Sequence, residues 1–394
     1  MASTPSLTSS SRRPSERIEP ARVAIQGGGP VLIIDDCSPR GASAVAAAAA
    51  SVTDETVNLL SRLSGGLLQV ALSPERAAAF MLPPLRSRHE VVPSPHDRPG
   101  PREEWLVSVE ARHGVGSGIS IVDRRTTIRL LGSEHPQPAT LARPGHLFPC
   151  RCHPGGVIAR AAIPEAALDL VAGFGMPDAA VFSYLLDEQG EVSNPVSARA
   201  FAEAHCLPVV TLSTLISSRL RHESLIEQIA SSALPTTNGG ELKAHVFRSR
   251  VDASEHVALV RGTIQPGEPT LIRVHVEDPI EDLVGSAQPL NSRNRLDTAL
   301  RQLQQSPCGV LVYLRPPLDR HALSARLLNP ERMQGSGPAA TQQTTSMMEF
   351  GMGAQILRSL AVESVIILRR SPRPYDILEL FGLRVVGYRE LEGN

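Results

Sequence analysis

Two adjacent acids, Asp35 and Asp36, follow the apolar run at residues 31–34 in the stretch VLIIDDCSPRGASAV. Paired carboxylates at the end of a buried strand can transfer protons or bind a divalent cation, because they supply both a base and oxygen ligands. The rest of the stretch carries a single charge, Arg40, before the small residues 41–44. The sequence therefore provides two carboxylates at the end of the strand, and the residues that follow supply no further acid.

A second group of polar residues begins with closely spaced glycines in GVGSGIS, residues 114–120. Asp123, Thr126 and Thr127 come next, in DRRTTIR. Backbone N–H groups, hydroxyls and basic side chains at a helix start can bind a phosphate. The glycine spacing does not match a dinucleotide fingerprint, so an ordinary turn before a helix is the alternative.

Two further basic segments could bind an anion. Arg143 and His146 lie in RPGHLFP, where the Pro-Gly setting carries more chemistry than a turn requires. Arg160 precedes a predicted helix start that contains Glu165. A basic side chain at a helix start can bind an anion, and an ordinary surface arginine is the alternative.

Some of the cysteines could be metal ligands. Cys150, Cys152 and His153 in PCRCHP could hold zinc, but no second ligand pair with suitable spacing follows. Ordinary thiols are the favoured interpretation. The five cysteines are scattered, which is typical of reduced thiols in the cytoplasm.

The composition places the chain among globular proteins. Its 394 residues are enough for two domains with separate cores. A net charge of −1 gives no electrostatic footprint for nucleic acid, and no apolar run reaches the length of about 18 residues expected of a membrane span. Residues 1–21 are rich in Ser, Pro and Arg, so we expect a disordered tail, with a transit peptide as the alternative.

Alternating helix and strand patterns predict a layered α/β or α+β domain over residues 22–222. Within it, residues 105–111 predict a single strand, and residues 83–103 an exposed loop. Residues 207–232 predict a strand, a turn and a long helix.

The second half predicts a separate unit. The polar residues 233–241 are interpreted as a junction. Alternating strands and an amphipathic helix at residues 290–305 then predict a domain over residues 223–394. Residues 330–346 are of low complexity and predict a mobile segment.

The blocks VLIIDD, GVGSGISIVDRRTTIR, RPGHLFPCRCHPGGVIAR and PEAALDL resemble, in this order, 3,4-dihydroxy-2-butanone-4-phosphate synthase, which acts on ribulose 5-phosphate in riboflavin biosynthesis. The second half resembles GTP cyclohydrolase II through EHVALVRG, LIRVHVE, LDTALRQL and FGMGAQILRSLAV. The resemblance implies a layered α/β synthase-like domain followed by a mixed-sheet cyclohydrolase-II-like domain. The fold class is therefore α+β and α/β, in two domains.

The resemblance also shows where the first half departs from its family. The family continues its strand as DDEDRENEGD, and its magnesium-binding Glu falls at Arg40 in this chain. The second magnesium ligand is the His of RxxHTE, whose position is Ile163. A substrate-contacting Glu falls at Tyr184.

The cyclohydrolase half departs in the same way. The resemblance places the three zinc-binding cysteines at Asp278, Pro289 and Asn291. The family's catalytic Asp-x-Arg becomes residues 346–348, Ser-Met-Met, and a family Lys becomes Pro374. Neither magnesium nor zinc, the metals that the family uses, is therefore expected here.

These departures predict a relative of the bifunctional protein with both active sites degenerate, acting in the cytoplasm as a binding, regulatory or assembly subunit. The partner would be a second copy or an active paralogue, with a sugar phosphate as a possible ligand and neither nucleic acid nor membrane as a partner. One alternative is an active synthase that uses Asp35, Asp36 and Glu165 as replacement acids. Another is an altered pentose-phosphate enzyme of specialised metabolism. The candidate phosphate-binding residues are Asp123, Thr126, Thr127, Arg143, His146 and Arg160.

Overall fold

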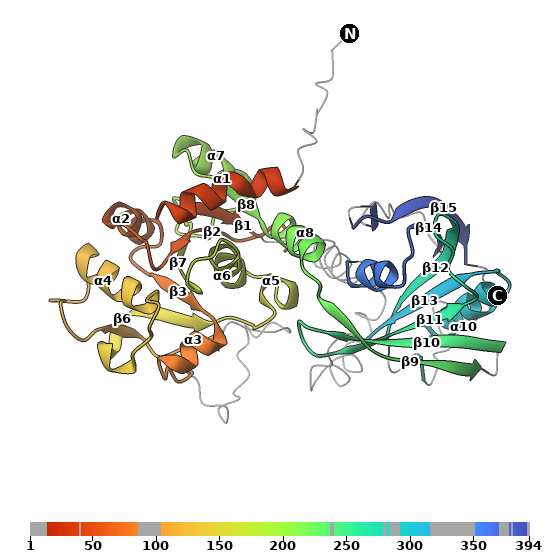
Figure 1. Cartoon of the computed structure of the whole chain (residues 1–394). Coiled ribbons are helices and arrows are strands. Elements are labelled where there is room, and N and C mark those ends of the chain that lie inside the picture. Colours follow the sequence, from red (N-terminus) through yellow and green to blue (C-terminus); the bar gives the residue numbers. More distant parts are fainter. Residues whose placement is uncertain are drawn as a thin grey trace, which may run out of the picture. The chain divides into compact units, whose positions relative to one another are not determined.

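The computed structural model describes residues 14–38, 41–85, 104–236, 240–278, 282–283, 292–315, 351–369, 378–379 and 381–391. The chain divides into two compact units, Met1–Ser218 and Arg219–Asn394. The predicted boundary at residue 222 lies a few residues later, because helix α8 (Leu212–His222) runs across the division. Figure 1 shows the course of the chain through both units.

The first unit is built on a mixed sheet with the strand order β4-β6-β3-β7-β2-β1-β8, and β5 pairs with β6. Strands β1, β2 and β3 are buried along their whole length, and β2 reads SAVAAA, so the centre of the sheet is packed with small side chains. The strands are β1 (Val31–Ile34), β2 (Ser43–Ala48), β3 (Gln69–Leu72), β4 (Glu104–Trp105), β5 (Val109–Ala111), β6 (Leu141–Arg151), β7 (Ala179–Tyr184) and β8 (Val209–Thr211).

Helices cover this sheet, and local capping fixes where several of them begin. Thr53 accepts a hydrogen bond from the Thr56 backbone N–H at the start of α2, and Ser120 does the same for Asp123 at the start of α4. Helices α2 and α7 contribute to the main apolar core on one face of the sheet, whereas α6 packs against β7, β2 and β3 without joining that core. The helices are α1 (Pro14–Gln26), α2 (Asp54–Leu63), α3 (Pro74–Ala79), α4 (Ile121–Leu131), α5 (Gly156–Ala159), α6 (Ile163–Gly173) and α7 (Pro195–Ala204), with a 3-10 turn at Pro138–Thr140.

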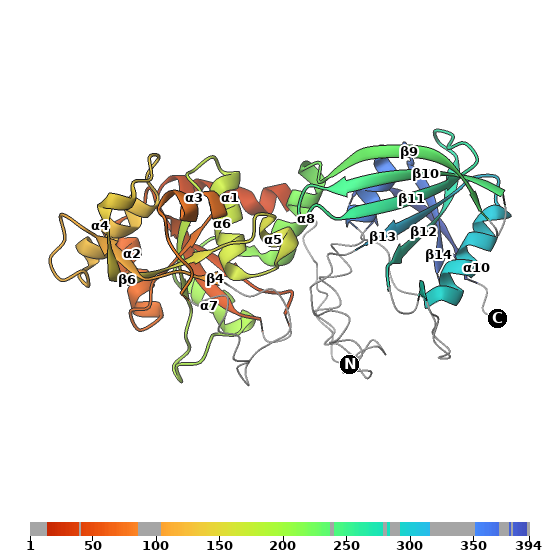
Figure 2. The same ribbon diagram turned by 90° about the horizontal axis from the view of Figure 1, so that it is seen from below.

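The second unit contains a seven-stranded sheet with the order β15-β14-β12-β13-β11-β10-β9. Its β9, β10, β11 and β13 pair antiparallel, and β13, β12, β14 and β15 pair parallel, which confirms the predicted mixed sheet. Figure 2 shows this sheet with α10 (Ser292–Gln304) beside it. The strands are β9 (Ile226–Thr236), β10 (Gly240–Ser249), β11 (Glu255–Arg261), β12 (Pro269–Val276), β13 (Gly309–Leu314), β14 (Ser364–Arg369) and β15 (Arg384–Glu390). Residues 351–359 are helical.

Several predicted elements were wrong. Residues 14–21, placed in a disordered tail, belong to α1, and Ile18 and Ala21 are buried there. The long helix predicted through residue 232 ends at His222, and β9 begins at Ile226. Pairing with β10 therefore outweighs the local helical pattern.

Other segments also differ from what was predicted, or lie outside the described residues. The proposed junction at 233–241 contains the end of β9 and the start of β10. The strand predicted at 105–111 is two short strands, β4 and β5. The Pro-Gly segment at 143–149, for which no strand was predicted, lies inside β6. Residues 86–103 and 330–346 lie outside the described residues.

The helices that the structure describes include none with the length and apolar character needed to cross a membrane.

A tight approach between the end of α4 and the turn that follows β2 gives a stability prediction. A Cβ atom at Gly132 would lie 2.4 Å from the Ala50 backbone nitrogen and 2.7 Å from the Ala49 carbonyl carbon. Gly132→Ala should therefore lower the free energy of unfolding by about 1–3 kcal/mol, because backbone atoms must move to admit the methyl group. Urea denaturation measures this loss.

Gly173→Ala is the matched control, because a Cβ atom there meets nothing within 4 Å. Its free energy of unfolding should stay the same or rise by up to about 1 kcal/mol. Equal unfolding midpoints for the two variants would contradict the steric explanation.

Candidate functional site

Asp35 closes the loop between β1 and β2. Its Oδ1 accepts hydrogen bonds from the backbone N–H groups of Cys37, at 2.9 Å, and Ser38, at 3.0 Å. Its own N–H donates to the Ala42 carbonyl at 2.8 Å. Burial raises the pKa of Asp35, and the two N–H donors limit that rise. This carboxylate therefore shapes its own loop.

Asp36 points in a different direction and caps a helix. Its Oδ1 accepts from the Ser213 backbone N–H at 3.0 Å, and its Oδ2 accepts from the Ser213 hydroxyl. Ser213 is the second residue of α8, so the carboxylate lies at the positive end of the helix dipole. The two adjacent acids thus serve separate structural contacts.

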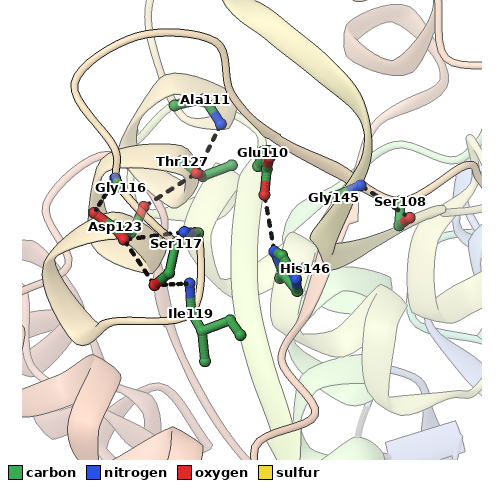
Figure 3. Close-up of polar contacts among 11 residues, drawn as sticks. Ser108, Glu110, Ala111, Gly116, Ser117, Ile119, Asp123, Thr127, Gly145 and His146 are labelled. Atoms are coloured by element: carbon green, nitrogen blue, oxygen red, sulfur yellow. Dashed lines mark hydrogen bonds and ion pairs between the residues drawn. The ribbon is translucent and has the colours of Figure 1, made fainter.

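Asp123 is the centre of a glycine turn at the start of α4 (Figure 3). Its carboxylate accepts from the backbone N–H groups of Gly116, at 3.2 Å, and Gly118, at 3.0 Å, and lies 3.5 Å from the Ser117 hydroxyl. Burial alone would raise the pKa of Asp123, but these hydrogen bonds and that with Ser120 outweigh it and lower the pKa. The donors that could have bound a phosphate are occupied by this carboxylate.

Glu110 and His146 form a half-exposed pair next to that turn. Glu110 Oε2 lies 2.8 Å from His146 Nδ1. A Cβ atom at Gly118 would lie 2.2 Å from Glu110 Oε2 and 2.6 Å from His146 Nδ1, so a side chain there would displace the pair, and the Gly118 φ of +75° also favours glycine. Figure 3 shows the carboxylate of Glu110 directed at the imidazole ring. Sequence reasoning missed Glu110, although its alternation with the buried Val109 and Ala111 marks it as a side chain facing away from the core.

The other predicted phosphate ligands are held locally. The Thr127 hydroxyl accepts from the Ala111 N–H at 2.9 Å and donates to the Asp123 carbonyl at 3.1 Å. The Thr126 hydroxyl donates to the Val122 carbonyl at 2.8 Å. Both hydroxyls are therefore engaged in local contacts, and that of Thr127 ties α4 to β5.

Arg143 lies on β6, in the same strand as His146. Its Nη2 donates to the Phe80 carbonyl at 2.6 Å, at the end of α3, and the residue is largely exposed. The exposed guanidinium keeps further N–H groups that can meet an anion.

Glu165 and Arg160 form a buried ion pair next to the residues that follow β6. Glu165 is fully buried and Arg160 is 8% exposed, and Glu165 Oε1 also accepts from the His153 backbone N–H at 2.9 Å. Burial raises the pKa of Glu165, whereas Arg160 and the His153 N–H oppose that rise. Glu165 Oε2 has no hydrogen-bond partner among the described residues.

Cys150 and Cys152 are buried beside this pair. A hydrogen bond with Cys150, together with burial, raises the pKa of Cys152 well above its usual value. Without a bound metal, the Cys152 thiol therefore stays protonated at neutral pH.

The resemblance assigns metals to positions of which the structure describes two. Ile163, at a magnesium position, is 3% exposed at the start of α6 and has no atom that can coordinate a cation. Asp278, at a zinc position, donates its backbone N–H to Asp282 Oδ2 at 3.0 Å. Arg40, Pro289 and Asn291 lie outside the described residues, as do residues 346–348 and Pro374.

Within the described ranges, no group of three or more His, Cys, Asp or Glu side chains is arranged to hold a metal ion. At the position that the resemblance assigns to magnesium, Ile163 does not fit a cation, because its side chain is apolar. At a position that the resemblance assigns to zinc, Asp278 replaces a thiolate with a carboxylate, which zinc can also bind.

A network that the sequence did not predict lies at the ends of β12 and β13. Asp282 accepts from the Tyr313 hydroxyl at 2.8 Å, and each of its carboxylate oxygens lies 3.2 Å from His275 Nε2. Burial and the Asp282 carboxylate raise the pKa of Tyr313, and burial lowers the pKa of His275. Asp282 therefore organises the residues that follow β12 by hydrogen bonds.

The Arg160–Glu165 pair predicts a large effect of substitution. Arg160→Leu should lower the free energy of unfolding at pH 7 by about 3–5 kcal/mol, because it leaves a buried carboxylate unpaired. A buried acid whose pKa is raised in the folded state lowers the free energy of unfolding as pH rises through that pKa. The loss of unfolding free energy in Arg160→Leu should therefore shrink in acid, where Glu165 is protonated. Adding Glu165→Leu should recover most of the loss, whereas an equally unstable double variant would contradict the pairing.

The lowered pKa of Asp123 predicts the opposite dependence of stability on pH. Its lowered pKa contributes stability above the ordinary aspartate value, about 3.9, and that stability is lost as pH falls through the folded-state pKa. Asp123→Asn should therefore lower the melting temperature at pH 7, and the difference from wild type should shrink below about pH 4. A difference that does not depend on pH would contradict the role of the charged carboxylate.

Comparison with known proteins places both units. The 3,4-dihydroxy-2-butanone 4-phosphate synthase family matches residues 19–218, and the GTP cyclohydrolase II family matches residues 227–390. The riboflavin biosynthesis protein RibBA of Aquifex aeolicus is 33% identical over 377 residues, which cover 94% of this chain and 90% of that protein. The monofunctional riboflavin biosynthesis protein RIBA 3, chloroplastic, of Arabidopsis thaliana is 31% identical over 377 residues. These residues cover 94% of this chain and 72% of the Arabidopsis protein.

A solved structure resembles the whole chain. It is the crystal structure of RibBX, a two-domain 3,4-dihydroxy-2-butanone 4-phosphate synthase from A. baumannii, with 27% identity and a TM-score of 0.76. The similarity covers 95% of this chain and 99% of RibBX. Sequence and fold agree, and the chain belongs to the family of riboflavin biosynthesis proteins in which a 3,4-dihydroxy-2-butanone 4-phosphate synthase domain precedes a GTP cyclohydrolase II domain.

Proposed function

We propose that this chain is a catalytically degenerate member of its family that binds a sugar phosphate through its first unit and serves as a regulatory or assembly subunit. The observation that carries the proposal is the use of the three candidate acids. Asp35 holds its own loop, Asp36 caps α8, and Glu165 pairs with Arg160. The contacts of these three acids are separate, and they do not bring the acids together at one reaction centre.

The chemistry of the synthase explains why this matters. Forming the butanone phosphate from ribulose 5-phosphate requires enolisation and a rearrangement of the carbon skeleton. These steps need acids and bases near the carbons and an oxyanion stabilised by a divalent cation. Losing a single such group can cost a factor of about 10²–10⁴ in rate, and here several are replaced together.

What remains is suited to binding. His146 and Arg143 lie on one exposed stretch of β6, with Glu110 fixing one side of the imidazole ring. A guanidinium and an imidazole can together hold the phosphate of a pentose phosphate. We place the protein in the cytoplasm, as a homodimer or in a heterodimer with an active paralogue.

The names of the relatives are compatible with partial loss of activity. The chloroplastic RIBA 3 of Arabidopsis thaliana bears the name monofunctional, and RibBX is described as a synthase with two domains. The second candidate function is an active synthase. It is favoured by the identity of 33% to RibBA along almost the whole chain.

Incubating the purified protein with ribulose 5-phosphate and Mg²⁺ separates the two candidates. We expect no formate above the buffer blank, and isothermal titration should detect binding of ribulose 5-phosphate. Removing a charged hydrogen-bonding group commonly costs about 1.5–3 kcal/mol, so His146→Ala should weaken that binding about 10–100-fold. Formate at an ordinary enzymatic rate, about 10 per second, would overturn the proposal.

His135→Ala is the matched control, because His135 is exposed and follows the opposite end of α4 from the Asp123 turn. It should leave the affinity unchanged. Absence of both formate and binding would contradict the sugar-phosphate part of the proposal, and equal loss in both histidine variants would contradict the assignment of His146.

A further inference from the structure

A buried histidine next to the turn between β10 and β11 contacts the end of β13. His256, on β11, is 4% exposed, and its Nδ1 accepts a hydrogen bond from the backbone N–H of Arg315 at 3.1 Å. Its Nε2 lies 3.4 Å from the Ser254 hydroxyl, which donates to Asp252 Oδ1 at 2.6 Å. A line of polar contacts therefore runs from the turn through His256 to the residue that follows β13.

These contacts fix which ring nitrogen of His256 carries the proton. A backbone N–H can only donate, so Nδ1, which faces Arg315, has no proton. The proton of the neutral ring is therefore on Nε2, where the Ser254 hydroxyl oxygen can accept it. Protonation of His256 takes place at Nδ1 and turns the acceptor of the Arg315 N–H into a second donor. The neutral ring therefore binds the Arg315 N–H, and the charged ring cannot.

The turn on the other side of the ring is held in one conformation. Ala253 has a φ of 59°, in the left-handed region that residues other than glycine rarely adopt. Its N–H donates to the Ser249 carbonyl at 3.1 Å, and the Ser249 hydroxyl accepts the Val251 N–H, also at 3.1 Å. Such strain persists only where neighbouring contacts hold the backbone in place. The Ser254 hydroxyl therefore has a fixed position beside His256.

The charges around His256 favour its neutral form. Burial lowers the pKa of His256, the Asp252 carboxylate opposes this fall, and the Arg315 guanidinium adds to it. Arg315 also pairs with Glu277, since its Nε lies 3.3 Å from both carboxylate oxygens. The cross-strand neighbour of His256 on β10 is Phe247, which carries no charge. A solvated histidine has a pKa of about 6.5, so a ring that leaves these surroundings takes up a proton below that pH.

We propose that His256 is a pH switch that holds the end of β13 when its ring is neutral and releases it when Nδ1 is protonated. β13 also carries Tyr313, two residues before Arg315, and the Tyr313 hydroxyl donates to Asp282 at 2.8 Å. Release of Arg315 therefore loosens the strand end that supports the Asp282 network. His275 does not act in this way, because its Nε2 faces the Asp282 carboxylate, which accepts from a charged ring as well. The switch does not depend on ligand binding by the first unit.

Hydrogen–deuterium exchange of the full-length protein tests the switch in a peptide that spans residues 309–315. A histidine whose pKa is lowered in the closed state stabilises that state fully above about pH 6.5, and this stability is lost as pH falls. After correction for the intrinsic exchange rate, the opening constant should be unchanged between about pH 8 and pH 7. It should rise by up to about tenfold for each pH unit below about 6.5. An opening constant that stays constant down to about pH 5 would overturn the proposal.

His256→Asn separates the titration of the ring from the contact that it makes. The asparagine side-chain oxygen lies close to the position of Nδ1 and can accept the Arg315 N–H, but it does not titrate. The opening constant should therefore lose its rise in acid. His245→Asn is the matched control, because His245 is buried in the same sheet and its Nδ1 has no hydrogen-bond partner among the described residues. This control should keep the rise, and a rise that survives His256→Asn or disappears in both variants would contradict the assignment.

Nitrogen-15 NMR of the imidazole rings gives a second readout on the unaltered chain, independent of how the variants fold. At about pH 7.5, His256 should carry its proton on Nε2 alone, and a proton on Nδ1 would rule out the switch. Arg315→Met removes the guanidinium but keeps the backbone N–H, so the rise in opening at low pH should persist. Loss of the rise in this variant would assign the effect to charge repulsion and overturn the role of the hydrogen bond.

Discussion

Removing a carboxylate from water costs several kcal/mol unless hydrogen bonds or an opposite charge compensate it, and the first unit is arranged around this constraint. Glu165, fully buried, depends on Arg160 and the His153 N–H. Asp123 is satisfied by the glycine turn that it organises. Because these acids stabilise loops and helix starts next to the sheet, the fold depends on their hydrogen bonds. A carboxylate that must keep its hydrogen bonds to preserve the fold is poorly placed to exchange protons with a substrate.

The second unit uses a carboxylate in the same way. Asp282 gathers His275, Tyr313 and the Asp278 N–H at the ends of two parallel strands. Such strand ends are where α/β proteins commonly bind ligands. In both units, therefore, the described part of the chain uses buried acids as acceptors in hydrogen-bonded networks.

Local signals in the sequence predicted much of the first unit. The capping hydroxyls of Thr53 and Ser120 are signals of this local kind, because a cap and the helix that follows it are neighbours in the chain. The family resemblance supplied the two-domain order and the mixed second sheet. β9 could not be predicted, because its side chains are exposed on both faces and its only order comes from pairing with β10. Of the candidate site, the residue types were visible in the sequence, but the pairing of Glu110 with His146 was not, since β5 and β6 meet only in the folded sheet.

The central claim is that the first unit has lost synthase activity while it keeps its fold. Complementation of a riboflavin auxotroph that lacks the synthase tests it most directly, with expression of the folded protein verified in the same cells. The account predicts no growth without added riboflavin for the wild-type chain, whether or not the Arg40→Glu and Ile163→His companion variant grows. Growth of cells that carry the unaltered chain would contradict it.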